Sequence, residues 1–296
     1  MKNIKPIKMK NDFLKNSIKV FMVILIFGLT ISSCKKDDVS SSYQQTVIPT
    51  DINALYESKG LAVKDTVIVY AHGGPTETLQ LEDVEELQFE NYYRVYVKQA
   101  QHINSTIQEN EITFAQATAE DAISTDMYQN VLEHFVNQGK VVVAMSHSFG
   151  SFIIPNVLAT KPNIAYKYII MAGRLDMPEV VWQGFRDGRQ YSFENGITPV
   201  EDGGGTPDSG GELSFTRLQA GLGQNRFTQL LVDKDLTNLS YLYGELDEPV
   251  GRLSNAEVEF LNDKNASAIT ITNGGHSSMF EPIILDFILN DIIREN

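Results

Sequence analysis

The sequence predicts an α/β fold with a mostly parallel central sheet and helices on both of its faces. Short apolar runs that favour buried strands alternate with longer segments of helical periodicity from residue 66 onward. The best defined unit is Lys140–Pro155, in which the apolar run Val141–Met145 turns sharply through Ser146–Gly150 into an amphipathic segment. One stretch, residues 172–238, interrupts the alternation, so we expect it to be an insertion in the fold.

The elements follow one another in a regular order. The predicted strands cover residues 66–71, 92–97, 141–145, 166–171, 239–243 and 268–272. The predicted helices cover residues 79–89, 119–138, 152–158, 255–261 and 280–293. Within the insertion the segment Gly203–Gly211 is rich in glycine, which indicates a mobile turn.

The first 33 residues have the pattern of a signal peptide. Six lysines precede the apolar run Val20–Leu29, which is too short to span a membrane stably. Ile31-Ser32-Ser33-Cys34 follows and resembles the lipobox of bacterial lipoproteins, which implies cleavage before Cys34 and a lipid on that residue. An ordinary secretory signal or an uncleaved anchor is the alternative. Cys34 is the only cysteine, which excludes an intramolecular disulfide.

The residues after Cys34 suggest a location. Lys35-Lys36-Asp37-Asp38 resembles the signal that sends some Gram-negative lipoproteins to the cell surface, although a solvated charge run explains it equally well. Residues 34–45 are polar and are predicted to be a tether. We therefore expect an extracytoplasmic protein, held by its lipid on a bacterial outer membrane and open to the cell surface.

The remaining residues, 46–296, are predicted to form one large domain with a full core. The whole chain has a formal net charge of −14. Without the leader it keeps 18 basic and 37 acidic residues, a net charge near −19. Phosphate binding requires a basic face, so nucleic acid is excluded as a partner. Anionic lipid headgroups would also repel the domain, which leaves the lipid on Cys34 as the membrane contact.

The turn Ser146-His147-Ser148-Phe149-Gly150 has the form of a nucleophile elbow, G-x-S-x-G, with serine in place of the first glycine. Such a turn holds the serine hydroxyl above the edge of the sheet, and a serine-rich surface loop is the alternative interpretation. A serine hydroxyl is a poor nucleophile at neutral pH, so Ser148 needs a base and the base needs an orienting partner.

His276 is the predicted base, because it lies in a loop that leaves the predicted last strand. The other four histidines are expected to have different roles. His147 should point its ring away from Ser148, while His102, in a polar loop, and His134, on a long helix, suit solvated or structural positions. His72 is expected to brace the loop that follows the first strand.

Two aspartates are candidates for the orienting acid. Asp247 follows the predicted strand 239–243, and Asp176 follows the predicted strand 166–171. Either can reach the carboxyl ends of the central strands, where ligands bind in open α/β sheets. The order Ser148, Asp247, His276 matches the serine, acid, histidine order of the elbow motif, which favours Asp247.

An acyl-transfer site must also stabilise an oxyanion. The amide of Phe149, next after the nucleophile, is one expected donor. His72-Gly73-Gly74-Pro75 is expected to supply the second, because glycines let the backbone approach a substrate and Pro75 has no N–H. Gly74 is favoured for this role, with Gly73 as the alternative.

Together these motifs resemble the α/β-hydrolase family over roughly residue 65 to the C-terminus. The run from His72 to Pro75 looks like that of the proline iminopeptidase branch, which usually has glycine where this chain has Thr76. The resemblance implies a Ser-His-Asp hydrolase that needs no metal or organic cofactor, with a cap formed by residues 172–238. We expect it to cleave a small-molecule acyl substrate, first of all a carboxylic ester. An aminopeptidase and a non-catalytic binding module on the same fold are the alternatives.

The predicted cap holds five of the eight arginines in the chain: Arg174, Arg186, Arg189, Arg217 and Arg226. They could bind a carboxylate on the substrate. The cap also has several acids, so ordinary ion pairing is the favoured explanation for these arginines. The same acids could instead hold the α-amino group of a peptide.

Overall fold

The computed structural model describes residues 43–79, 81, 89, 91–203, 207 and 209–293. The leader, Cys34 and most of the tether lie outside these residues, as does most of the predicted helix 79–89. Over the described part of the chain, none of the helices combines the length and the apolar character needed to cross a membrane.

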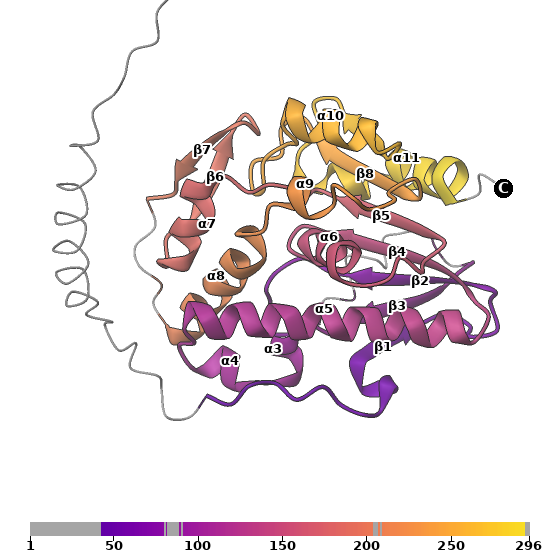
Figure 1. Cartoon of the computed structure of the whole chain (residues 1–296), viewed down its shortest axis with the longest axis horizontal. Helices are drawn as coiled ribbons and strands as arrows, with labels where there is room; N and C mark the ends of the chain where they lie inside the picture. The colour runs from indigo at the N-terminus through magenta and orange to yellow at the C-terminus, as the bar shows by residue number, and fades with distance from the viewer. Residues whose placement is uncertain are drawn as a thin grey trace, which may run out of the picture. The chain divides into compact units, whose positions relative to one another are not determined.

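The domain is organised around a seven-stranded sheet (Figure 1). Its strand order is β1 (Tyr56–Lys59), β3 (Tyr93–Val97), β2 (Thr66–Ala71), β4 (Val141–His147), β5 (Lys167–Met171), β8 (Leu239–Gly244) and β9 (Ser267–Ile271). All neighbouring pairs are parallel except β1 with β3. The predicted mostly parallel sheet is therefore confirmed, with one antiparallel edge strand in addition.

Helices connect the strands and cover the sheet. Before β4 these are the 3₁₀ turn η1 (Ile52–Leu55), α3 (Ala100–Ile103), α4 (Thr106–Glu109) and α5 (Phe114–Asn137). After β4 come α6 (Gly150–Thr160), α10 (Asn255–Asp263), the 3₁₀ turn η2 (His276–Phe280), α11 (Pro282–Phe287) and the π-helical segment η3 (Ile288–Ile293).

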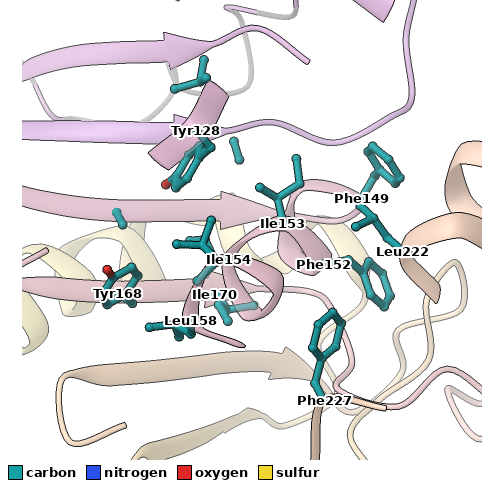
Figure 2. Packing of buried hydrophobic residues seen from close by; sticks show 14 of the residues in the cluster. Tyr128, Phe149, Phe152, Ile153, Ile154, Leu158, Tyr168, Ile170, Leu222 and Phe227 are labelled. Carbon is teal, nitrogen blue, oxygen red and sulfur yellow. The ribbon is translucent and has the colours of Figure 1, made fainter. Parts of the chain in front are cut away.

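Alternate residues of the central strands face opposite sides of the sheet, as the two-residue period of a strand requires. In β2, Val67 and Val69 belong to a buried cluster with α5 and α6, whereas Ile68 and Tyr70 belong to a second cluster with α11 and η3. Figure 2 shows part of the first cluster, where apolar side chains of α6 meet Tyr168 and Ile170 of β5. Both faces are thus covered, which explains why the central strands are mostly apolar on both sides.

Two helix boundaries differ from the prediction. Helix α5 begins at Phe114, not at residue 119, because Thr113 and Gln116 form a reciprocal cap: the Gln116 amide donates to Thr113 Oγ1 (3.2 Å) and the Thr113 amide to Gln116 Oε1 (2.7 Å). The predicted helix 280–293 is confirmed from Pro282 to Ile293 but begins two residues later than predicted. Pro282 starts α11 after η2, and at Ile288 the backbone widens into the π-helical segment η3.

The segment between β5 and β8, residues 172–238, contains its own small set of elements. They are α7 (Glu179–Arg186), the hairpin β6 (Tyr191–Glu194) and β7 (Thr198–Glu201), α8 (Gly210–Gly223) and α9 (Phe227–Leu230). We call this the cap segment. The predicted mobile turn is wrong at its end: Gly210 and Gly211 begin α8, and a Cβ on Gly211 would lie 2.0 Å from the Gln108 carbonyl oxygen. Residues 204–206 and 208 lie outside the described part.

The contact between α5 and α8 encloses an acid. The Asp121 side chain is buried, and neither carboxyl oxygen has a hydrogen-bond partner among the described residues. A Cβ on Gly221 of α8 would lie 2.0 Å from Asp121 Oδ2, so the two helices meet directly over this group. Burial, and after it the Glu120 carboxylate, raise the pKa of Asp121 well above its ordinary value.

We expect Asp121→Asn to raise the melting temperature, and to raise it more as pH increases from about 5 to about 8. An acid whose pKa is higher in the folded state than in the unfolded chain binds more protons when folded. Its contribution to stability therefore falls as pH rises above the unfolded pKa of about 4. Thermal unfolding followed by circular dichroism measures the difference. Asp126→Asn, which removes a partly exposed partner of Lys161, is the matched control. A pH-independent difference for Asp121→Asn contradicts the prediction.

Candidate active site

The turn between β4 and α6 has the geometry predicted for a nucleophile elbow. Ser148 has a φ of 54°, in the left-handed region that side chains rarely adopt. Helix α6 starts two residues later, at Gly150, where a Cβ would lie 2.2 Å from the carbonyl oxygen of Ala71 in β2. Only glycine fits there, and this close approach forces the chain to turn at Ser148. The Ser148 amide donates to the Met171 carbonyl of β5 (3.1 Å).

The structure brings His276 and Asp247 together. His276 begins η2 after β9, and Asp247 follows β8. His276 Nδ1 lies 3.0 Å from both carboxyl oxygens of Asp247. Since a carboxylate only accepts, Nδ1 carries the hydrogen and Nε2 is left with a lone pair. Asp247 is fully buried and also accepts from the Val250 amide (3.0 Å). His276 is thus oriented to accept a proton at Nε2.

The alternative acid, Asp176, has a structural position. Its carboxylate accepts from the amide (3.2 Å) and the hydroxyl of Thr228, and its backbone forms a bridge with Arg226. These contacts join the start of the cap segment to α9. The geometry therefore pairs His276 with Asp247 and not with Asp176.

Ser148 and His276 lie on loops that follow the parallel strands β4 and β9, at the same edge of the sheet. Among the described residues, no hydrogen bond links the Ser148 hydroxyl to the His276 ring. Hydrogen bonds between a nucleophile and its base often form fully only when a substrate is bound, so the lack of this bond does not exclude His276 as the base.

The glycine loop after β2 lies against Ser148. A Cβ on Gly73 would be 3.2 Å from Ser148 Cβ and 3.7 Å from its hydroxyl oxygen, so the lack of a side chain brings this backbone close to Ser148. Gly74 has a φ of +125° and lines the same cavity as Ser148. Phe149 precedes the first residue of α6, so its amide has no carbonyl partner within that helix. Of the predicted oxyanion donors, Phe149 thus lies in the elbow, and Gly73 and Gly74 lie in the glycine loop.

Buried polar side chains support the glycine loop. His72 packs its ring against His102 of α3 at a centroid distance of 5.0 Å. Burial lowers the pKa of His72 to about 3 and that of His102 to about 4. His102 is half-buried in α3 and packs against His72, so it is not solvated in a loop. Sequence reasoning missed Gln99, whose side chain donates to the His72 carbonyl (3.0 Å). A lone glutamine carries no pattern that could have revealed this contact.

A cavity of about 420 Å³ opens over Ser148. Its lining joins the elbow and glycine loop to the loop after Asp247 and to the cap segment. The residues are Gly74, Ser148, Phe149, Phe152, Met177, Phe185, Gln190, Tyr191, Ser192, Asp202, Gln219, Glu248, Pro249 and Val250. Two of them, Asp202 and Glu248, are acids, and no lysine or arginine is among these described lining residues.

The five cap arginines are engaged elsewhere. Their bonds are Arg174 to Glu257 (3.4 Å), Arg186 to Asp187 (2.8 Å), Arg189 to Glu201 (2.8 Å), Arg217 to Glu111 (2.9 Å) and Arg226 to the Met177 carbonyl (2.6 Å). None of them lines the cavity. Ion pairing, the favoured prediction, thus explains four of them, and Arg226 bonds a carbonyl. Over the described chain, no three His, Cys, Asp or Glu side chains gather as a metal site.

No protein-family model and no curated protein matches the sequence. Solved structures do match. An α/β-hydrolase enzyme from a Medee basin deep-sea metagenome library superimposes with a TM-score of 0.54 at 17% identity, over 79% of this chain and 92% of that one. A lipase-esterase related protein from Clostridium acetobutylicum gives 0.53 at 13% identity, over 79% and 98%. E-2-(Acetamidomethylene)succinate hydrolase gives 0.52 at 14% identity, over 81% and 96%.

The chain has the α/β-hydrolase fold. In an α/β-hydrolase sheet the carboxyl ends of the parallel strands meet at one edge, where ligands bind. Here Ser148 follows β4, Asp247 follows β8, His276 follows β9 and the glycine loop follows β2. Four loops that are distant in sequence therefore converge at that edge.

Proposed function

We propose that the protein is a serine hydrolase that cleaves a carboxylic ester through an acyl-enzyme. The observation that carries this proposal is the pair formed by the buried Asp247 and the half-buried His276, at the same sheet edge as Ser148, which lines the cavity in a strained left-handed turn. Strain of this kind costs about 1–3 kcal/mol and concentrates at functional sites. A non-catalytic binding module would have no need of such a turn beside an oriented histidine.

The proposed reaction begins with attack of Ser148 Oγ on the ester carbonyl carbon. His276 Nε2 takes the hydroxyl proton, and Asp247 holds the Nδ1 proton and stabilises the charged ring. The amides of Phe149 and Gly74, or Gly73 in place of Gly74, donate to the tetrahedral oxyanion. The leaving alcohol departs with the proton from His276. Water, deprotonated in turn by His276, then hydrolyses the acyl-enzyme and restores Ser148.

We expect Ser148→Ala to lower kcat by about 10⁴- to 10⁶-fold while the protein stays folded, because the nucleophile is lost. Hydrolysis of a p-nitrophenyl acyl ester gives kcat, and circular dichroism gives the fold. Covalent labelling by a fluorophosphonate probe should be lost as well. A folded variant that keeps more than about a tenth of the wild-type rate would exclude Ser148 as nucleophile.

Asp247→Asn should lower kcat by about 10⁴-fold, because an amide no longer holds the histidine tautomer that leaves Nε2 free to accept. Asp176→Asn is the matched control, since this aspartate bonds Thr228 and not His276. Its effect should be confined largely to stability. Steady-state kinetics and melting temperatures of both variants separate the two roles, and the reverse ranking would assign the acid to Asp176.

One observation favours a second candidate, the release of an N-terminal residue from an aminoacyl amide. Asp202 and Glu248 line the cavity, and none of the described lining side chains is a lysine or arginine. The positively charged amine of a peptide substrate could therefore pair with a carboxylate without competition from a cationic side chain of the lining. Asp202 Oδ1 accepts from the Ser192 hydroxyl (2.6 Å), which fixes its orientation. Ester hydrolysis ranks first, because Thr76 departs from the iminopeptidase pattern.

Comparing a p-nitrophenyl acyl ester with an alanyl or prolyl anilide decides between the two candidates. We expect kcat/KM to be higher for the ester, and Asp202→Asn and Glu248→Gln to change it by less than about threefold. Efficient anilide cleavage that is lost on N-acetylation, and that falls at least about tenfold in either variant, would reverse the ranking.

A further inference from the structure

His147, the last residue of β4, contacts the loop that carries the proposed base. Its ring lies 4.7 Å from the His276 ring, centroid to centroid, at an angle of 49°. Its Nε2 lies 3.3 Å from the His276 carbonyl oxygen. Phe280 packs edge-on against the His147 ring at 4.6 Å. His147 is 7% exposed, so these neighbours replace solvent around it.

The protonation state of His147 follows from these contacts. A carbonyl oxygen only accepts, so His147 Nε2 carries the hydrogen that it donates to His276. Burial, and after it the neighbouring His276 ring, lower the pKa of His147 to about 3. The ring is therefore neutral at neutral pH, and no second positive charge stands beside His276 when that residue takes up a proton.

We propose that His147 is a positioning residue, whose hydrogen bond to the His276 backbone holds the base in register with Ser148; this role rests on the proposed serine-hydrolase function. Asp247 fixes the rotation of the His276 ring from the Nδ1 side. The Leu246 amide donates to the Gly274 carbonyl (2.8 Å), which ties the start of this loop to the chain that carries Asp247. His147 adds a direct tie between the His276 backbone and the elbow, because it is the residue directly before Ser148 in the chain.

The cavity lining separates this role from substrate binding. The His147 ring is occupied by His276 and Phe280, and His147 is not among the described residues that line the cavity over Ser148. Loss of its hydrogen bond should therefore change kcat and leave KM nearly unchanged. A displacement of about 1 Å between reacting groups can cost about 100-fold in rate.

Three substitutions test the role of the hydrogen bond. His147→Gln keeps an N–H donor at about the reach of Nε2, His147→Asn is one methylene shorter, and His147→Phe keeps the ring without a donor. We expect kcat to fall about 10- to 100-fold in His147→Asn and His147→Phe, and less than about threefold in His147→Gln. KM should stay within about twofold in all three. The Gln and Asn pair remains decisive if the aromatic variant does not fold.

His134→Phe is the matched control for exchanging a histidine ring. His134 lies on α5, where its ring contacts Tyr56 and Phe135, and kcat should not change. Ester kinetics, fluorophosphonate labelling rates and melting temperatures are measured for every variant. Wild-type kcat in His147→Asn and His147→Phe, or an equal loss of kcat in His147→Asn and His147→Gln, would overturn the positioning role of His147. The proposed serine-hydrolase function would not be affected by either result. A wild-type protein that neither labels nor hydrolyses would contradict the proposed function, and this role with it.

Discussion

The close approach of α6 to β2 is the constraint on which the site depends. At Gly150 the helix backbone lies so near the Ala71 carbonyl that no side chain fits between them. The chain must therefore reverse within the two residues after β4, which forces the left-handed conformation of Ser148. The Met171 carbonyl secures the turn by accepting from the Ser148 amide (3.1 Å) and the Ser151 hydroxyl (2.6 Å). The cost of the strain is offset by the apolar packing of α6, part of which Figure 2 shows.

Buried carboxylates fix the other loops at this edge of the sheet, because a buried charge is tolerated only with partners. Asp247 satisfies its charge with His276 and the Val250 amide, so the acid and the base hold each other in place. Glu257 of α10 does the same for the loop after β5, accepting from the amides of Leu175 and Asp176 (2.9 and 2.8 Å) and pairing with Arg174. Buried carboxylates thus have a proposed catalytic role at one loop and a structural role at the next.

Features that depend on local pattern could be predicted, and those that depend on tertiary placement could not. Strands buried on both faces are continuous apolar runs, so β2, β4, β5 and β8 were evident, and the elbow followed from small residues at fixed spacing. Strand β1 has only four residues and forms through its pairing with β3, so it left no signal. The contacts of Gln99 and His147 join residues that lie 27 and 129 positions apart, and no sequence period reports such pairs.

The charge of the residues that line the cavity also could not be predicted from the sequence. Five arginines in the cap segment allowed a cationic pocket by composition alone. In the fold, four pair with acids and the fifth bonds a carbonyl, so none contributes its charge to the lining. Asp202 directly follows β7, and Glu248 lies in the loop after β8. Only folding brings both acids to the cavity. Which charges face the cavity is therefore set by ion pairing in the fold and not by the composition of the cap segment, since one of the two acids belongs to the cap segment and the other to the loop after β8.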